Sequence, residues 1–212
     1  MNTDNRKQST DNTLDLYIII TKPVLKYTQI AEICVRNQIK YLQLREKDIE
    51  DRELLQIARD ISSITKNSDT KFIINDRVDI CLLAGADGVH LGQDDISFAD
   101  AKRLLPLDKI IGLSTHDLTQ ATEALKLDPD YIGFGPIYAT PTKRKPDPVV
   151  GCELLSEVLK IATIPVIAIG GIDDTNIQNV IIAGAKNICM VRYFMETEEL
   201  EERIKKFMIY KF

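Results

Sequence analysis

The stretch KYLQLREKDIEDRELLQIARDISSITKNSDTKFIIN (residues 40–75) contains one complete unit of the pattern that decides the fold. Its two ends, KYLQL (40–44) and KFIIN (71–75), are short and apolar, as expected of strands inside a sheet. Between them, residues 50–66 place apolar side chains three and four positions apart, which is typical of an amphipathic helix. A strand, a helix and a second strand in this order predict a parallel βαβ unit.

The same alternation continues along the rest of the chain. The candidate strands are residues 16–20, 40–44, 71–75, 87–91, 109–113, 130–135, 165–170 and 187–191. Eight strand–helix units in 212 residues predict a single (β/α)8 TIM barrel. A doubly wound open sheet is the alternative, but eight parallel units are closed more easily than they are left with free edges. We therefore predict a barrel domain at 15–212, preceded by a disordered tail at 1–14.

Composition and charge narrow the class of protein. The chain is 44% hydrophobic and 28% charged, which is ordinary for a globular protein. Its formal net charge of −5 argues against nucleic acid or an anionic membrane as the main partner. The polar amino terminus lacks the apolar core of a secretion signal, and no apolar run approaches the roughly 18 residues of a membrane span. With four widely spaced cysteines and no CxxC pair, these features predict a cytoplasmic protein.

A barrel of this kind carries its chemistry at the carboxyl ends of its strands. After the second predicted strand, Gln43, Arg45 and Lys47 alternate, so strand periodicity places them on one face and Leu44 on the other. Two cations at a barrel mouth favour an anionic ligand. A rim of salt bridges with acids such as Glu46 would also explain them.

The other strand ends add acidic groups and groups that can bind phosphate. In order, they present Asn75 and Asp76, then Asp94 and Asp95 of GVHLGQDD (88–95), Ser114, then Thr140, Thr142 and Lys143 in a long loop, and finally Gly170 and Gly171. Each signal is weak alone, because acidic pairs are common in solvated turns and a hydroxyl such as that of Ser114 can cap the next helix. Together they place basic, acidic and phosphate-binding groups at one rim.

The set QLREK, IND, GVHLGQDD, STH, DYIGFGPIYATPTK and IAIGGI resembles the thiamine phosphate synthase family, in the same order, over about residues 15–195. The resemblance implies a transferase of thiamine biosynthesis. It would join 4-amino-5-hydroxymethyl-2-methylpyrimidine diphosphate to a carboxylated or plain methyl-hydroxyethylthiazole phosphate, giving thiamine phosphate and diphosphate. The implied partners are these small molecules, with neither nucleic acid nor membrane, and a homo-oligomer is left open.

Carried over position by position, the resemblance assigns roles to the strand ends. It implies Mg²⁺ as cofactor, held by Asp76 and Asp95, which singles out the second aspartate of the pair. It implies three catalytic residues, Arg45, Ser114 and Lys143. The substrate-binding residues would be Gln43, Leu44, Arg45, Glu46, Lys47, Asn75, Ser114 and Lys143 for the pyrimidine diphosphate, and Thr140, Pro141, Thr142, Gly171, Val191 and Arg192 for the thiazole phosphate. Arg192 departs from the family, which usually has a small residue there, most often serine.

Two other functions compete with the transferase. Related thiazole tautomerases share the barrel but resemble the synthase less at the diphosphate-binding positions. A non-catalytic regulatory paralogue would be expected to lose charged site residues, whereas this chain keeps the set from Gln43 to Lys143. Of the two histidines, His90 is expected to be a packed, hydrogen-bonded structural residue. His116 is expected to lie at a helix start and not to act as a base.

Overall fold

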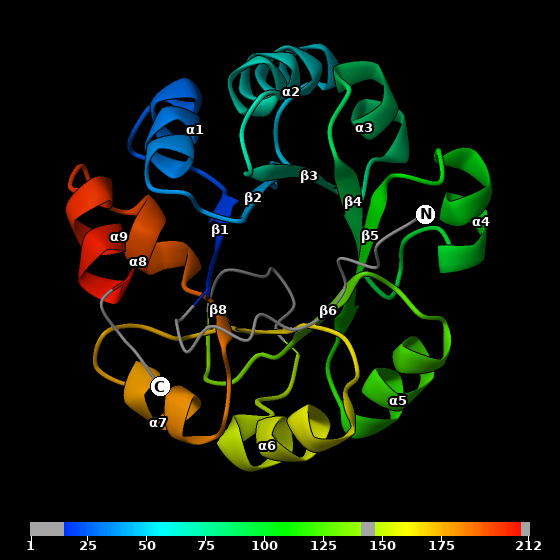
Figure 1. The fold of residues 1–212 in the computed structure, drawn as a ribbon, viewed down its shortest axis with the longest axis vertical. Helices are drawn as coiled ribbons and strands as arrows, with labels where there is room; N and C mark the ends of the chain where they lie inside the picture. The colour runs from blue at the N-terminus through cyan, green and yellow to red at the C-terminus, as the bar shows by residue number, and fades with distance from the viewer. Residues whose placement is uncertain (1–14, 141–146, 209–212) are drawn as a thin grey trace.

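The computed structural model describes residues 15–140 and 147–208, and these residues form the predicted barrel. Parallel strands pair in chain order and β8 pairs with β1, which closes the sheet and rules out the open alternative (Figure 1). The predicted tail at 1–14 lies outside the described residues. The strands are β1 (Asp15–Ile20), β2 (Tyr41–Leu44), β3 (Lys71–Asn75), β4 (Gly88–Leu91), β5 (Ile110–Thr115), β6 (Tyr131–Phe134), β7 (Val166–Ile169) and β8 (Asn187–Cys189).

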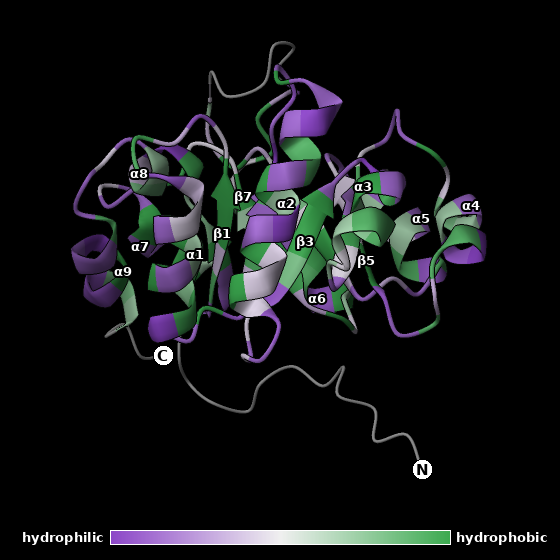
Figure 2. Cartoon of the chain, turned by 90° about the horizontal axis from the view of Figure 1, so that it is seen from above, coloured by the Kyte–Doolittle hydropathy of each residue, from purple (hydrophilic) through white to green (hydrophobic). Residues whose placement is uncertain are grey.

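Helices surround the barrel (Figure 1). They are α1 (Tyr27–Arg36), α2 (Asp51–Thr65), α3 (Val78–Ala84), α4 (Phe98–Leu104), α5 (Leu118–Lys126), α6 (Gly151–Ile161), α7 (Ile177–Ile182), α8 (Val191–Met195) and α9 (Leu200–Met208). Hydrophilic and hydrophobic residues alternate along α2, as the amphipathic pattern requires (Figure 2). Within 15–140 and 147–208, no helix has the length and apolar character needed to cross a membrane.

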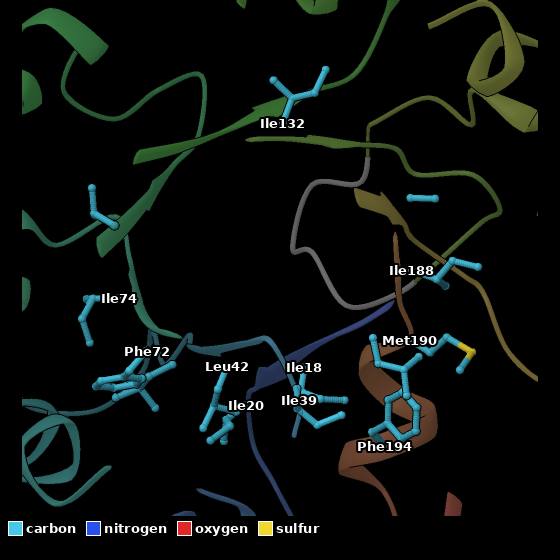
Figure 3. Close-up of a cluster of buried hydrophobic side chains, with 14 of the residues drawn as sticks. Ile18, Ile20, Ile39, Leu42, Phe72, Ile74, Ile132, Ile188, Met190 and Phe194 are labelled. Carbon is cyan, nitrogen blue, oxygen red and sulfur yellow. The ribbon is translucent and has the colours of Figure 1, made fainter. Parts of the chain in front are cut away.

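Alternate strand residues divide the core into two layers. Ile18 and Leu42 point outward and pack in the large cluster beneath the helices (Figure 3). Tyr17, Ile19 and Tyr131 point inward and fill the barrel interior. Because successive side chains of a strand lie on opposite faces, a single strand serves both layers. Full burial of each large apolar side chain contributes about 1.5–3 kcal/mol. The layers therefore hold the strand ends in place around the barrel mouth.

Candidate active site

A cavity of about 540 Å³ opens at the carboxyl ends of the strands. Each of the eight strands, or the loop that follows it, contributes to its wall, with Arg45 after β2, Ser114 in β5 and Gly170 after β7 as examples. The position agrees with the rule that barrels of this class carry their chemistry at this end.

The inner part of the cavity is lined by hydrogen-bonded polar side chains. Gln43 Nε2 donates to the Tyr17 hydroxyl at 2.8 Å, and the hydroxyls of Tyr17 and Tyr131 lie 2.6 Å apart. His90 Nδ1 lies 3.1 Å from the Tyr131 hydroxyl, and its Nε2 lies 2.8 Å from Ser114 Oγ. His90 is thus hydrogen-bonded as expected, but it also lines the cavity. The sequence did not identify Tyr17 or Tyr131 as cavity residues. The feature that could have indicated them is a polar hydroxyl at an inward-facing position of a strand.

The end of β2 separates its side chains as the alternation predicts. Gln43 and Arg45 line the cavity, while Leu44 is buried in the outer core. Glu46 accepts hydrogen bonds from the Lys22 backbone N–H at 2.6 Å and from the Tyr27 hydroxyl at 3.0 Å. The carboxylate of Glu46 therefore links the end of β2 to the loop after β1. The side chain of Leu44 lies away from the cavity.

The two cations at this rim have different surroundings. Lys47 Nζ lies 2.9 Å from Asp76 Oδ2, so Lys47 takes part in a rim salt bridge. The Arg45 guanidinium has no hydrogen-bond or ion-pair partner among residues 15–140 and 147–208. The salt-bridged rim accounts for Lys47 but not for Arg45, whose charge faces the cavity.

Asp76 and Asp95 meet at the ends of β3 and β4. The Asp76 N–H donates to the His90 carbonyl at 2.8 Å, and Asp95 Oδ2 accepts from the Gly92 N–H at 2.6 Å. Burial, together with the hydrogen-bonded contact to the Asp76 carboxyl, raises the pKa of Asp95. Asp94 is exposed. The second aspartate of the pair is therefore the one turned toward Asp76.

The paired carboxylates suit a hard divalent cation. Their closeness disfavours two negative charges, and a cation between them would relieve the repulsion. No group of three or more His, Cys, Asp or Glu side chains forms a metal site within the described ranges. A metal held here would take its remaining ligands from substrate and water, as Mg²⁺ commonly does.

The opposite side of the mouth is built from backbone. Gly171 has a φ of 64°, and a Cβ there would lie 2.7 Å from the Tyr138 carbonyl oxygen, so only glycine fits. Thr140, Val191 and Arg192 also line the cavity, and Val191 begins α8. Pro141, Thr142 and Lys143 lie outside the described residues.

Arg192 is exposed at the cavity mouth. Hydrogen bonds from Thr175, and to a smaller degree the charge of Arg192, hold the pKa of Asp173 below its usual value. The guanidinium therefore lies at the rim within electrostatic reach of the loop after β7.

The start of α5 is capped by Asp117, and the neighbouring His116 and Ser114 have other partners. The Asp117 side chain accepts from the Gln120 N–H at 2.7 Å and is the helix cap. His116 lies just before it, as expected, with Nδ1 2.6 Å from the Gly135 carbonyl oxygen. Ser114 Oγ pairs with His90 instead of capping the helix.

The sequence profile of thiamine monophosphate synthase matches residues 16–194 of the chain. The chain belongs to the thiamine monophosphate synthase family. It is 36% identical to a thiamine-phosphate synthase of Clostridium novyi, over 90% of this chain and 95% of that relative. Its structure superimposes on a thiamine phosphate pyrophosphorylase of Pyrococcus furiosus with a TM-score of 0.81 and 31% identity, covering 92% of this chain and 95% of the other.

Relatives of the thiamine monophosphate synthase family differ in length. The chain is 41% identical to a thiamine-phosphate synthase of Synechocystis over 84% of its own residues, but it spans only 52% of that relative. It spans nearly all of the Clostridium novyi relative. The barrel is therefore the part that this chain shares with both.

Proposed function

We propose that the chain catalyses thiamine phosphate synthesis, joining 4-amino-5-hydroxymethyl-2-methylpyrimidine diphosphate to a methyl-hydroxyethylthiazole phosphate, carboxylated or plain. The observation that carries the proposal is the rim formed by β2, β3 and β4. It holds the Arg45 guanidinium, which has no ion-pair partner among the described residues, beside the two strand ends that carry Asp76 and Asp95. This combination suits a diphosphate with its counter-ion, and the family membership supports it.

The pyrimidine diphosphate would bind against the ends of β2 to β5. Gln43, Asn75 and Ser114 supply neutral hydrogen-bonding groups from the cavity wall. Arg45, with Lys47 and Lys143, would contact the diphosphate oxygens. Asp76 and Asp95 would hold Mg²⁺, whose charge, when bound, neutralises the leaving diphosphate. The backbone of Leu44, and not its buried side chain, would face the ligand.

The proposed reaction needs position and charge rather than a protein nucleophile. The methylene–oxygen bond of the pyrimidine diphosphate breaks, and the diphosphate leaves with the electron pair. The aminopyrimidine ring delocalises the resulting positive charge, and the thiazole nitrogen lone pair then forms the new carbon–nitrogen bond. With a carboxylated thiazole, carbon dioxide leaves as well. Arg45 and Lys143 would stabilise the charge that develops on the leaving group, and Ser114 would orient the pyrimidine.

The thiazole phosphate would bind at the other side of the mouth. Gly171 brings backbone close to the ligand there, and the start of α8 at Val191 lies beside it. Thr140, with Pro141 and Thr142, would complete the phosphate site. The two substrates would then meet over the hydrogen-bonded side chains of the barrel interior.

One assay distinguishes the transferase from the alternatives. The purified protein is mixed with both substrates and Mg²⁺, and thiamine phosphate is measured. A tautomerase would convert the thiazole without forming thiamine phosphate, and a regulatory paralogue would bind a ligand and release no diphosphate. Arg45 has no partner within residues 15–140 and 147–208, and a cation facing the cavity favours the transferase, because a tautomerase needs no diphosphate-binding cation and a regulatory paralogue would be expected to lose charged site residues.

We place the catalytic domain at residues 15–212 and the reaction in the cytoplasm, with small molecules as the main partners. The four cysteines are free thiols, which supports a reducing compartment.

Arg192→Ser is expected to raise the apparent KM for the thiazole phosphate and to leave that for the pyrimidine diphosphate unchanged. A hydrogen bond to a charged group contributes about 1.5–3 kcal/mol. The exposure of Arg192 reduces this through solvent screening, so we expect a change of about threefold to tenfold. Steady-state kinetics with each substrate varied in turn measure it.

The matched control for Arg192 is Arg103→Ser, which removes an exposed arginine from α4, a helix outside the cavity wall. Equal KM values for the thiazole phosphate in wild type and Arg192→Ser would show that the backbone holds the phosphate unaided.

A further inference from the structure

A continuous chain of hydrogen bonds crosses the barrel interior. It runs from Gln43 on β2 through Tyr17 on β1 and Tyr131 on β6 to His90 on β4, and it ends at Ser114 on β5. The cavity meets this chain at its two ends and along its length, because all five side chains line the wall.

One direction of donation through this network starts from Gln43. Gln43 Nε2 donates to the Tyr17 oxygen, so the Tyr17 hydrogen is available for the Tyr131 oxygen at 2.6 Å. When Tyr17 donates to Tyr131, the Tyr131 hydrogen is left for His90 Nδ1, 3.1 Å away. Each tyrosine keeps its hydrogen, because burial raises the pKa of both hydroxyls well above the ordinary value.

The assignment reaches the cavity through the imidazole. A neutral His90 that accepts at Nδ1 carries its hydrogen on Nε2, which lies 2.8 Å from Ser114 Oγ. Ser114 Oγ then accepts from His90, and its own hydrogen is left for the cavity. With the opposite polarity, Ser114 would donate to His90 and present only an acceptor. The direction of the chain therefore decides what the cavity offers a ligand.

Packing holds the side chains of the hydrogen-bond network in place. The rings of Tyr131 and His90 stack with their centroids 5.5 Å apart, and Tyr17 stacks on Tyr41 at 5.5 Å. Gly112 leaves room for the Tyr131 ring, since a Cβ there would lie 2.1 Å from Tyr131 Cζ. The hydrogen-bonded side chains are therefore held in place before a ligand enters.

We propose that Tyr17, Tyr131 and His90 are positioning residues that orient Ser114 as a hydrogen-bond donor toward an acceptor atom of the pyrimidine diphosphate. This inference rests on the proposed function for the identity of the ligand. The direction of donation through the hydrogen-bond network does not depend on the proposed function. It can be measured without any turnover.

The first test is the tautomer of His90. The chain has two histidines, His90 and His116. The Gly135 carbonyl can only accept, so a neutral His116 carries its hydrogen on Nδ1. Long-range ¹H–¹⁵N spectra of histidine-labelled protein, at a pH where both rings are neutral, should show opposite tautomers, with His90 protonated on Nε2. A His90 protonated on Nδ1 would overturn the proposal.

The second test removes one link. Tyr131→Phe takes away the donor to His90 Nδ1 and should lower kcat/KM for the pyrimidine diphosphate by about tenfold, equivalent to about 1.4 kcal/mol of barrier. The KM for the thiazole phosphate should not change. Tyr17→Phe interrupts the chain one step earlier and should act in the same direction, which keeps the test valid if one variant folds poorly.

Tyr41→Phe is the matched control for these variants. Tyr41 packs against both Tyr17 and Tyr131, but its hydroxyl forms no hydrogen bond with any residue in 15–140 or 147–208. It should keep wild-type kinetics. Equal kinetics for Tyr131→Phe and Tyr41→Phe would refute the positioning role. Absence of thiamine phosphate with the wild-type protein would refute the proposed function instead and leave the tautomer result standing.

Discussion

Asp95→Ala is expected to lower turnover at ordinary Mg²⁺ concentrations by at least about a hundredfold, because a metal ligand supplies several kcal/mol of transition-state stabilisation. Asp94→Ala should change turnover much less. Asp95 is turned toward Asp76, and its pKa is raised by burial and by that contact, whereas Asp94 is exposed. Thiamine phosphate formation across a Mg²⁺ titration measures both variants.

A second substitution tests the other carboxylate. Asp76→Ala should also remove most turnover, but the φ of 61° at Asp76 adds backbone strain in alanine. Asp76→Asn is the cleaner variant, because asparagine tolerates this conformation and lacks only the charge. Binding of Mn²⁺, followed by electron paramagnetic resonance with diphosphate present, reports the metal site without turnover. Near-wild-type activity of Asp95→Ala would exclude this metal assignment.

Arg45→Ala is expected to lower turnover by at least about tenfold, which corresponds to about 1.4 kcal/mol of barrier. The guanidinium faces the cavity and has no partner in the part of the chain that the structure describes, so its charge is available to a diphosphate that becomes more negative as it leaves. The folded state should survive, because a rim cation is not part of the core. Single-turnover rates and thermal unfolding measure the two effects separately. Lys143→Ala should lower turnover by a similar factor, and this expectation rests on the family resemblance alone.

The control for this charge is Arg52→Ala, an exposed arginine in the first turn of α2. It should keep both activity and stability. If Arg45→Ala instead lost heat stability and kept its specific activity, Arg45 would be a structural rim residue, and the diphosphate assignment would fail.

Much of the candidate site could be predicted because strands and helices have short periods. Alternation alone placed Gln43 and Arg45 on one face of β2 and Leu44 on the other, and the structure confirms this division. The amphipathic spacing of 50–66 likewise predicted α2 to within one residue at each end. These features depend on neighbours a few positions apart, which a single sequence displays directly.

Contacts between distant residues were decided only by the tertiary structure. Tyr17 and Tyr131 are 114 positions apart, and no local pattern indicates that their hydroxyls meet. The pairing of Lys47 with Asp76 likewise depends on the approach of two strand ends. Local propensity does not distinguish Asp94 from Asp95, although the family resemblance had singled out the second. The turn backbone and the Gly92 N–H orient it.

The sequence by itself therefore determined the element order, the faces of the strands and the rim that carries the polar groups. The fold decided the closure of β8 onto β1 and the hydrogen-bond network through the interior. It also decided the position of Arg45, which has no salt-bridge partner among the described residues. The physical reason is that a closed barrel brings together strand ends that are far apart along the chain, and its packing fixes which of their side chains meet.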